Sequence, residues 1–98
     1  MPTVSVIMNC LNGEKYLRDA IDSVYTQTYK DWEIVFWDNA SIDRSGEIAK
    51  SYGERVLYFR SDRTHSLGKA RNSAFAQARG DFIAILDVDD IWLPDKLE

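Results

Sequence analysis

The sequence has little of several residue types, and each shortage excludes a class of protein. Its 98 residues include a single cysteine, Cys10, so no internal disulfide can form. Only 12 Lys and Arg stand against 16 Asp and Glu, and the formal net charge of -4 argues against nucleic acid as a partner. No apolar run approaches the roughly 18 residues of a membrane span, and no signal-peptide pattern is seen. We therefore expect a cytoplasmic location, at the inner face of a membrane if a longer parent protein attaches there.

The residues that are present favour a folded core. Apolar residues make up 45% of the chain and charged residues 29%, which is the balance of a soluble globular protein. Short runs rich in β-branched and aromatic residues predict strands at residues 3–8, 32–37, 55–59 and 82–86. Apolar residues at helical spacing and helix-end signals predict helices at residues 14–28, 44–52 and 67–79.

The order of these elements predicts the fold class. Strands and helices alternate, and each crossover is long enough to join parallel neighbours. We therefore expect an α/β fold with an open, mostly parallel sheet of about four strands flanked by helices. The strongly apolar run at residues 82–86 is interpreted as a buried central strand.

Local signals predict where the helices begin and end. Asn12 is placed to cap the first helix, and Ser41 or Asp43 to cap the second. Gly80 stands where a left-handed residue would end the third helix, as Gly53 does for the second. The last residues, LPDKLE, are typical of the first turn of a further helix.

Polar residues follow three of the predicted strands at their carboxyl ends, where ligands bind in open α/β sheets. Asp87 and Asp89 are two residues apart, so in extended backbone their carboxylates project to the same side, which distinguishes them from Asp90. Two converging carboxylates favour Mg²⁺ or Mn²⁺, whose shell is completed by water and phosphate oxygens. The polar residues at these strand ends are Asn9, Cys10, Asp38, Asn39, Asp87, Asp89 and Asp90.

Basic residues near the third predicted helix give a second, weaker indication of a phosphorylated ligand. They are Arg60, Arg63, Lys69 and Arg71. No G-x-G-x-x-G follows the first strand and no G-x-x-x-x-G-K-[ST] occurs, so dinucleotide and P-loop sites lack their usual motif. A pyrophosphate is therefore expected to be held mainly by the metal.

Three blocks of the sequence match one family in order and spacing. They are VSVIMNCLNGEKYL, QTYKDWEIVFWDNASID and ARNSAFAQARGDFIAILDVDDIWLPDKLE. Over nearly all 98 positions, the chain resembles the amino-terminal, nucleotide-binding part of family-2 glycosyltransferases, which have the Rossmann-like GT-A fold. The third block contains the D-x-D signature of that family.

The resemblance implies a nucleoside-diphosphate sugar as donor and Mg²⁺ or Mn²⁺ as cofactor. Asp89 matches the direct metal ligand, and Asp87 the residue near the ribose or the metal. Asn9 matches the loop that borders the nucleoside. Family members commonly have a second Asp that contacts the base where this chain has Asn39; an amide can still accept a hydrogen bond from an imide N–H, and the base preference stays open. The expected nucleotide-sugar-binding residues are Asn9, Asp38, Asn39, Arg71 and Asp87.

The resemblance also implies the reaction: inverting, metal-dependent sugar transfer in cell-envelope polysaccharide biosynthesis. The general base and the site for a glycan or lipid-linked acceptor lie beyond the D-x-D motif in the family, so no catalytic residue is expected in this chain. We expect residues 1–98 to be a single domain, the truncated amino-terminal part of a catalytic domain, that binds donor with little or no transfer. A homodimer is expected because the missing part would leave surface uncovered.

Two other functions remain open on sequence alone. IAILDVDD also resembles the first motif of haloacid-dehalogenase-type phosphatases, in which Asp87 would be the nucleophile and Asp89 the acid, although Ile91 stands in place of Thr or Val. A non-catalytic nucleotide-binding module is the second alternative. The single histidine, His65, is interpreted as a solvated loop residue.

Overall fold

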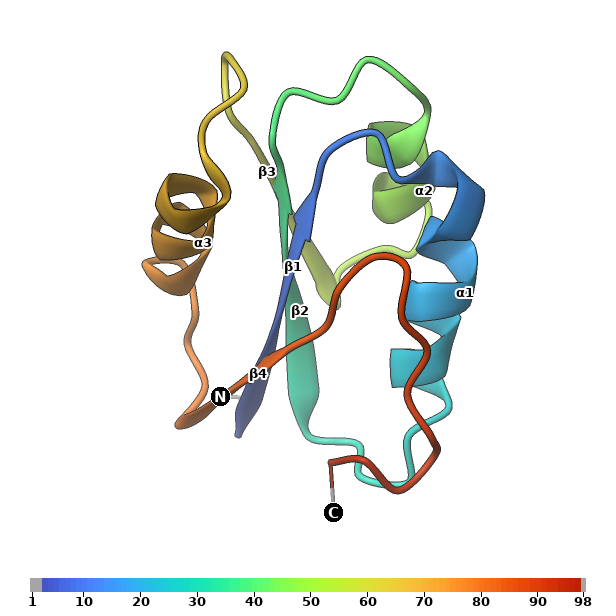
Figure 1. The fold of residues 1–98 in the computed structure, drawn as a ribbon. Coiled ribbons are helices and arrows are strands. Elements are labelled where there is room, and N and C mark those ends of the chain that lie inside the picture. Colours follow the sequence, from blue (N-terminus) through green and yellow to red (C-terminus); the bar gives the residue numbers. More distant parts are fainter. Residues whose placement is uncertain (1–2, 98) are drawn as a thin grey trace.

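The computed structural model describes residues 3–97, which fold as four strands and three helices in strict alternation (Figure 1). In chain order the elements are β1 (Val4–Cys10), α1 (Glu14–Tyr25), β2 (Trp32–Asp38), α2 (Ser45–Lys50), β3 (Val56–Arg60), α3 (Leu67–Phe75) and β4 (Phe82–Ile85).

The four strands form one parallel sheet in the order β3-β2-β1-β4. Cys10 pairs with Asp38, and Asp38 with Arg60, so β1, β2 and β3 end at the same level. β4 pairs with β1 up to Ile85 opposite Ile7, and therefore ends three residues below that level. The predicted open α/β fold is confirmed, and the carboxyl ends of the strands share one edge.

The helices cover both faces of the sheet. α1 and α2 lie on one face and α3 on the other (Figure 1). Because side chains alternate across a strand, Val6 and Met8 of β1 pack toward α1, whereas Ile7 packs with Ala74 of α3. The predicted apolar face of α1 is confirmed, since its buried side chains include Leu17, Ala20, Ile21 and Val24.

The start of α1 differs from the prediction. The N-cap is Gly13, and Asn12 adopts a left-handed conformation with a φ of 55°. The Asn12 Oδ1 accepts a hydrogen bond of 2.8 Å from the Ile42 N–H, so this side chain joins two loops instead of capping its own helix. The free N–H groups at this helix end are bound by the side chains of Asp43, in the loop before α2, and of Ser45, the first residue of α2.

All three helices end earlier than predicted. α1 ends at Tyr25 instead of residue 28, α2 at Lys50 instead of residue 52, and α3 at Phe75 instead of residue 79. Gly80 does not adopt the left-handed conformation. Among residues 3–97, the glycine with a positive φ is Gly53. A Cβ on Gly80 would lie 2.7 Å from the Ser5 N, so glycine is required there by close approach to β1.

The interpretation of the last strand as a buried central strand is wrong. β4 is an edge strand, and Phe82, Ile83 and Ile85 are 66%, 50% and 45% exposed. Among the described residues, β4 pairs with one strand, β1. In the apolar run, the buried side chain is that of Leu86, the residue just after β4.

The expected further helix after β4 does not form within the described residues. Residues 94–97 make a turn, with a 3.1 Å bond from the Lys96 N–H to the Leu93 carbonyl, and residue 98 lies outside the described part. None of the helices within residues 3–97 is both long enough and apolar enough to cross a membrane.

Candidate functional site

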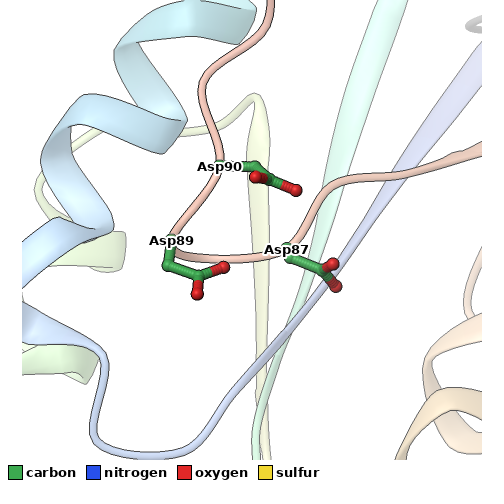
Figure 2. Close-up of side chains that lie close together, drawn as sticks. All are labelled: Asp87, Asp89 and Asp90. Carbon is green, nitrogen blue, oxygen red and sulfur yellow. The ribbon is translucent and has the colours of Figure 1, made fainter.

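Three carboxylates converge immediately after β4. Asp87, Asp89 and Asp90 lie in a short turn, residues 87–90, which we call the acidic turn (Figure 2). One oxygen of each carboxylate lies within 4.8 Å of the others, and all three residues are exposed. Within the turn, the Asp90 N–H donates to the Asp87 carbonyl at 3.0 Å.

The acidic turn corrects one prediction. Extended backbone was expected to bring Asp87 and Asp89 together and to send Asp90 elsewhere. The strand instead ends at Ile85 and the chain reverses at residues 88 and 89, so Asp90 joins the same cluster. The sequence spacing identified Asp87 and Asp89 as a pair, and the turn adds Asp90 to the cluster.

The acidic turn is fixed to the core on its upstream side. The Leu86 N–H donates to the Ile7 carbonyl at 3.1 Å, and the Leu86 side chain is 1% exposed. Val88 packs on the core, and a Cβ on Gly13 would lie 3.0 Å from a Val88 methyl carbon. Glycine at the start of α1 therefore allows the loop after β1 to lie against the acidic turn.

Arg71 approaches the acidic turn from α3. Its Nη2 lies 3.9 Å from the Asp87 Oδ1, while its buried Nε has no hydrogen-bond partner. An Arg with unused donors beside a carboxylate cluster provides positive charge and hydrogen bonds for an anionic group. Of the other basic residues singled out from the sequence, Arg63 and Lys69 are exposed and Arg60 is bound to Asp38.

A pocket of about 150 Å³ opens at the carboxyl ends of β1 and β2. We call it the β1–β2 pocket. The Asn9 Oδ1 is a buried acceptor without a hydrogen-bond partner, and such a group is costly unless a ligand or water satisfies it. The residues that line the pocket are Asn9, Cys10, Leu11, Asn39, His65 and Leu67.

Asn39 forms one wall of the β1–β2 pocket by holding His65. Its Nδ2 donates to the His65 carbonyl at 2.8 Å, and its Oδ1 accepts from the His65 N–H at 2.9 Å. The Ser61 hydroxyl donates to the same Oδ1 at 3.3 Å. Both ends of the amide are thus engaged with the loop before α3.

Sequence reasoning missed His65 as a pocket residue. We expected a solvated loop side chain, whereas His65 is half-buried and lines the pocket. Its place depends on Asn39, 26 positions earlier, so no local sequence signal could have identified it.

Asp38 lies behind the pocket and is fully buried. Its carboxylate accepts bonds from the Tyr58 hydroxyl at 2.5 Å, the Arg60 Nη1 at 2.9 Å and the Ser41 N–H at 2.8 Å. Burial and the bond to Asp38 raise the pKa of Tyr58. With three donors engaged, Asp38 fixes the turn after β2, and its side chain is not on the pocket surface.

Cys10 is a small buried residue at the end of β1. It is 2% exposed, and burial raises the pKa of its thiol above the ordinary value. A raised pKa disfavours the thiolate, so Cys10 is poorly suited to act as a nucleophile.

The donor set of the acidic turn fits a hard divalent cation. Three carboxylate oxygens on exposed side chains supply oxygen ligands and leave room for water and phosphate oxygens, as Mg²⁺ and Mn²⁺ require. The Asp residues could hold the ion, and Arg71 lies where it could contact a phosphate group bound to it.

Comparisons with known proteins identify the family of the chain. The family model described as glycosyl transferase family 2 matches residues 5–98. An uncharacterized glycosyltransferase of Methanocaldococcus jannaschii is 43% identical over 99% of this chain, which covers 35% of that relative. A putative teichuronic acid biosynthesis glycosyltransferase of Bacillus subtilis, TuaG, is 36% identical over 99% of this chain, which covers 40% of it. The chain thus spans between a third and two fifths of the length of these curated relatives.

Solved structures share the fold. A crystal structure of Staphylococcus aureus TarS in complex with UDP superposes with a TM-score of 0.91 and 29% identity, covering 97% of this chain and 30% of that one. A Pyrobaculum calidifontis mannosyltransferase in complex with GDP-Man and Mn²⁺ gives a TM-score of 0.85 and 26% identity, covering 93% of this chain and 28% of that one.

Proposed function

Since the chain belongs to glycosyl transferase family 2, we propose that it forms the donor-binding part of an enzyme that transfers a sugar from a nucleoside-diphosphate sugar with the help of a divalent cation. The single observation that carries the proposal is the convergence of three carboxylates beside Arg71, at the sheet edge that also holds the β1–β2 pocket.

The residues divide into two groups with different roles. We assign Asp89 as direct metal ligand and Asp87 as a ligand of the metal or the ribose, with Asp90 as a third carboxylate near the ion. Arg71 contacts the diphosphate. Asn9 contacts the nucleoside through its unpaired Oδ1, and Asn39 and Asp38 shape the pocket. A relative bound to UDP and another bound to GDP-Man and Mn²⁺ support a nucleotide and a cation as ligands of this edge.

The chemistry of the site follows from charge. A bound Mg²⁺ or Mn²⁺ would stabilise the negative charge that develops on a departing nucleoside diphosphate. Arg71 adds positive charge and hydrogen bonds beside Asp87, and the Asn9 side chain, with its buried Oδ1, orients the nucleoside. These residues bind and orient the donor; none is placed to deprotonate an acceptor.

The remaining steps of the reaction belong to the rest of such an enzyme. We propose that residues 1–98 form the amino-terminal part of a larger catalytic domain whose other part supplies the general base and the acceptor site. An inverting reaction and a glycan or lipid-linked acceptor are part of the proposal. The relative named for teichuronic acid biosynthesis supports a polysaccharide product.

The test is a titration of UDP and GDP, each with and without Mn²⁺, by calorimetry. We expect Mn²⁺-dependent binding to the wild-type chain, and a loss of at least about tenfold in affinity for Asp89→Ala. Asp19→Ala is the matched control, because Asp19 is an exposed carboxylate on α1 outside the acidic turn. Its affinity should stay within about twofold of wild type.

Four outcomes would contradict the proposal. Binding that is unaffected by Mn²⁺, or equally weakened by both substitutions, would remove the metal role of the acidic turn. No nucleotide binding under any condition would reject donor binding. A covalent phosphate on Asp87 after incubation with a phosphorylated compound would instead favour a phosphatase.

A further inference from the structure

Residues 91–97, the segment that follows the acidic turn, are attached to the loop after α1 by the buried side chain of Gln27 and by Thr28. The Gln27 Nε2 donates to the Leu93 carbonyl at 2.7 Å, and its Oε1 accepts from the Leu97 N–H at 3.1 Å. The neighbouring Thr28 N–H donates to the Pro94 carbonyl at 2.8 Å. These bonds join positions 66 to 70 residues apart in the sequence.

Gln27 is suited to hold this segment in a single position. It is 0% exposed and also donates to the Ser23 carbonyl at 3.1 Å, so both ends of its amide are bound. Leaving a buried amide without hydrogen-bond partners costs more free energy than a typical hydrogen bond contributes. The segment is therefore strongly favoured to stay bound to Gln27. Trp92 and Leu97 pack on the core around it.

The acidic turn therefore lies between two attachments. Upstream, Leu86 bonds to β1, and within the turn Val88 packs on the core; downstream, Trp92 packs on the core and Leu93 bonds to Gln27. Asp89 and Asp90 lie between Val88 and Leu93. Their position consequently depends on the downstream attachment more than that of Asp87 does.

The carboxylates oppose their own arrangement. Three like charges within 4.8 Å of one another repel, and because the side chains are exposed, packing does little to oppose this repulsion. Within the turn it is opposed by the 3.0 Å bond from the Asp90 N–H to the Asp87 carbonyl. If the downstream attachment is lost, residues 89–93 are no longer held in one position, and the entropy cost of closing the turn must be offset by binding of the metal. A fixed turn avoids that cost before the ion binds.

We propose that Gln27 is a positioning residue for the metal site: by holding residues 93–97, it keeps Asp89 and Asp90 beside Asp87 without touching them or the ion. The metal part of this proposal rests on the proposed function. The mechanical part, the order of the acidic turn, does not.

The experiment compares Gln27→Met with the wild-type chain. Met keeps the length and buried volume of the side chain but removes its three hydrogen bonds. Val56→Ala is the control, because Val56 is a buried residue of β3 at the opposite edge of the sheet, so it lowers the melting temperature without contacting the segment. Backbone order parameters come from ¹⁵N relaxation, and Mn²⁺ affinity from paramagnetic broadening with Mn²⁺ alone.

In Gln27→Met we expect the order parameters of residues 89–93 to fall from about 0.85 to below about 0.6, while that of Leu86 is unchanged. Mn²⁺ affinity should fall at least about tenfold. In Val56→Ala both quantities should match wild type despite the lower melting temperature. Gln27→Glu, which retains the acceptor for the Leu97 N–H, should recover part of the order at low pH, where a protonated carboxyl can also donate.

Unchanged order at residues 89–93 in Gln27→Met would overturn the proposal, whatever the metal does. Lost order with unchanged Mn²⁺ affinity would overturn the link between Gln27 and the metal site. Absence of Mn²⁺ broadening at residues 87–90 in the wild-type chain would reject the metal role in the proposed function, and with it the metal part of this inference. The order parameters would still decide the mechanical part.

Discussion

Asp38 and Asn39 are neighbours in the chain, yet their side chains hold different parts of the site. Asp38 is buried and binds Tyr58, Arg60 and the turn after β2. Asn39 binds both the N–H and the carbonyl of His65, which an amide can do because it has a donor and an acceptor. A carboxylate at position 39 could accept from the His65 N–H but could not donate to its carbonyl. The choice of Asn therefore fits a role in shaping the β1–β2 pocket.

At the residue scale, we predict that Asn39→Asp destabilises the protein. The new carboxylate would face the His65 carbonyl without a proton to donate, so the unfolding free energy should fall by about 1–3 kcal/mol at pH 7. Urea unfolding followed by circular dichroism measures the change. Asn72→Asp makes the same chemical change on an exposed residue of α3 and should shift stability by no more than about 0.5 kcal/mol. Equal effects of the two substitutions would show that the contact with His65 contributes nothing.

The connection from α3 to β4 decides where the acidic turn begins. After α3 ends at Phe75, the chain crosses close under β1, where the Gly80 N–H donates to the Ser5 Oγ at 2.8 Å. The Phe82 N–H then donates to the Thr3 carbonyl at 3.0 Å and β4 starts. The register of β4 on β1, and with it the position of residues 87–90, follows from this crossing.

At the element scale, we predict opposite effects for two glycine substitutions. Gly80→Ala places a Cβ 2.7 Å from the Ser5 N and 2.9 Å from the Thr3 carbonyl oxygen, both backbone atoms, so it should cost about 1–3 kcal/mol. Gly68→Ala in α3 meets nothing within 4 Å and should stabilise the protein by about 0.5–1 kcal/mol, since alanine loses less entropy in a helix. Thermal unfolding of both variants checks the signs. A neutral Gly80→Ala would mean that the crossing can move without cost.

The whole molecule is held together at the other end of the sheet by a buried carboxylate. Glu33 of β2 is 3% exposed and accepts bonds from the Ser5 hydroxyl at 2.6 Å and the Arg79 Nε at 2.8 Å. The Arg79 Nη2 lies 2.7 Å from the same carboxylate, and the Arg79 N–H also donates to it. Glu33 thus joins β1, β2 and the crossing to β4, the exposed edge strand. Burial alone would raise the pKa of Glu33, but the bonds from Ser5 and Arg79 outweigh it and lower the pKa below the ordinary value of 4.5.

At the scale of the whole molecule, we predict that Glu33 makes stability depend on pH. Because its pKa is lowered in the folded state, its ionised form stabilises the fold above pH about 4.5, and this contribution is lost as the pH falls through the folded-state pKa. Glu33→Gln should lower the unfolding free energy by about 2 kcal/mol at pH 7, less than for a fully buried pair because Arg79 is half-exposed. Glu33→Gln should also make the unfolding free energy fall less steeply as the pH is lowered.

Chemical denaturation at a series of pH values between 3 and 8 measures this profile. Glu47→Gln is the control, since Glu47 and its partner Arg44 are both 74% exposed and such pairs contribute little. A Glu33→Gln profile parallel to that of wild type would assign the acid sensitivity to other carboxylates.

Much of the site could be predicted because many of its residues lie in short sequence motifs or at the ends of predicted strands. The D-x-D spacing identified Asp87 and Asp89, and the strand ends identified Asn9, Asp38 and Asn39 as residues of one edge. What could not be predicted depends on contacts between distant segments. His65 reaches the pocket through Asn39, Asp90 joins the acidic turn through a chain reversal, and Gln27 holds a segment 66 residues away.

The sequence by itself determined the alternation of strands and helices, the parallel sheet and the family, because apolar periodicity and local motifs are properties of neighbouring residues. Only the tertiary structure decided which polar side chains stay unpaired at the sheet edge and which are hydrogen-bonded inside the protein. A buried polar group must find a partner, and that partner is chosen by the packing of elements that the sequence does not place side by side. The same holds for the segment FIAIL, residues 82–86, which is apolar enough for a central strand but lies at the edge of the sheet. Its hydrophobicity favours burial, but the packing of the other elements determines how much of it is buried.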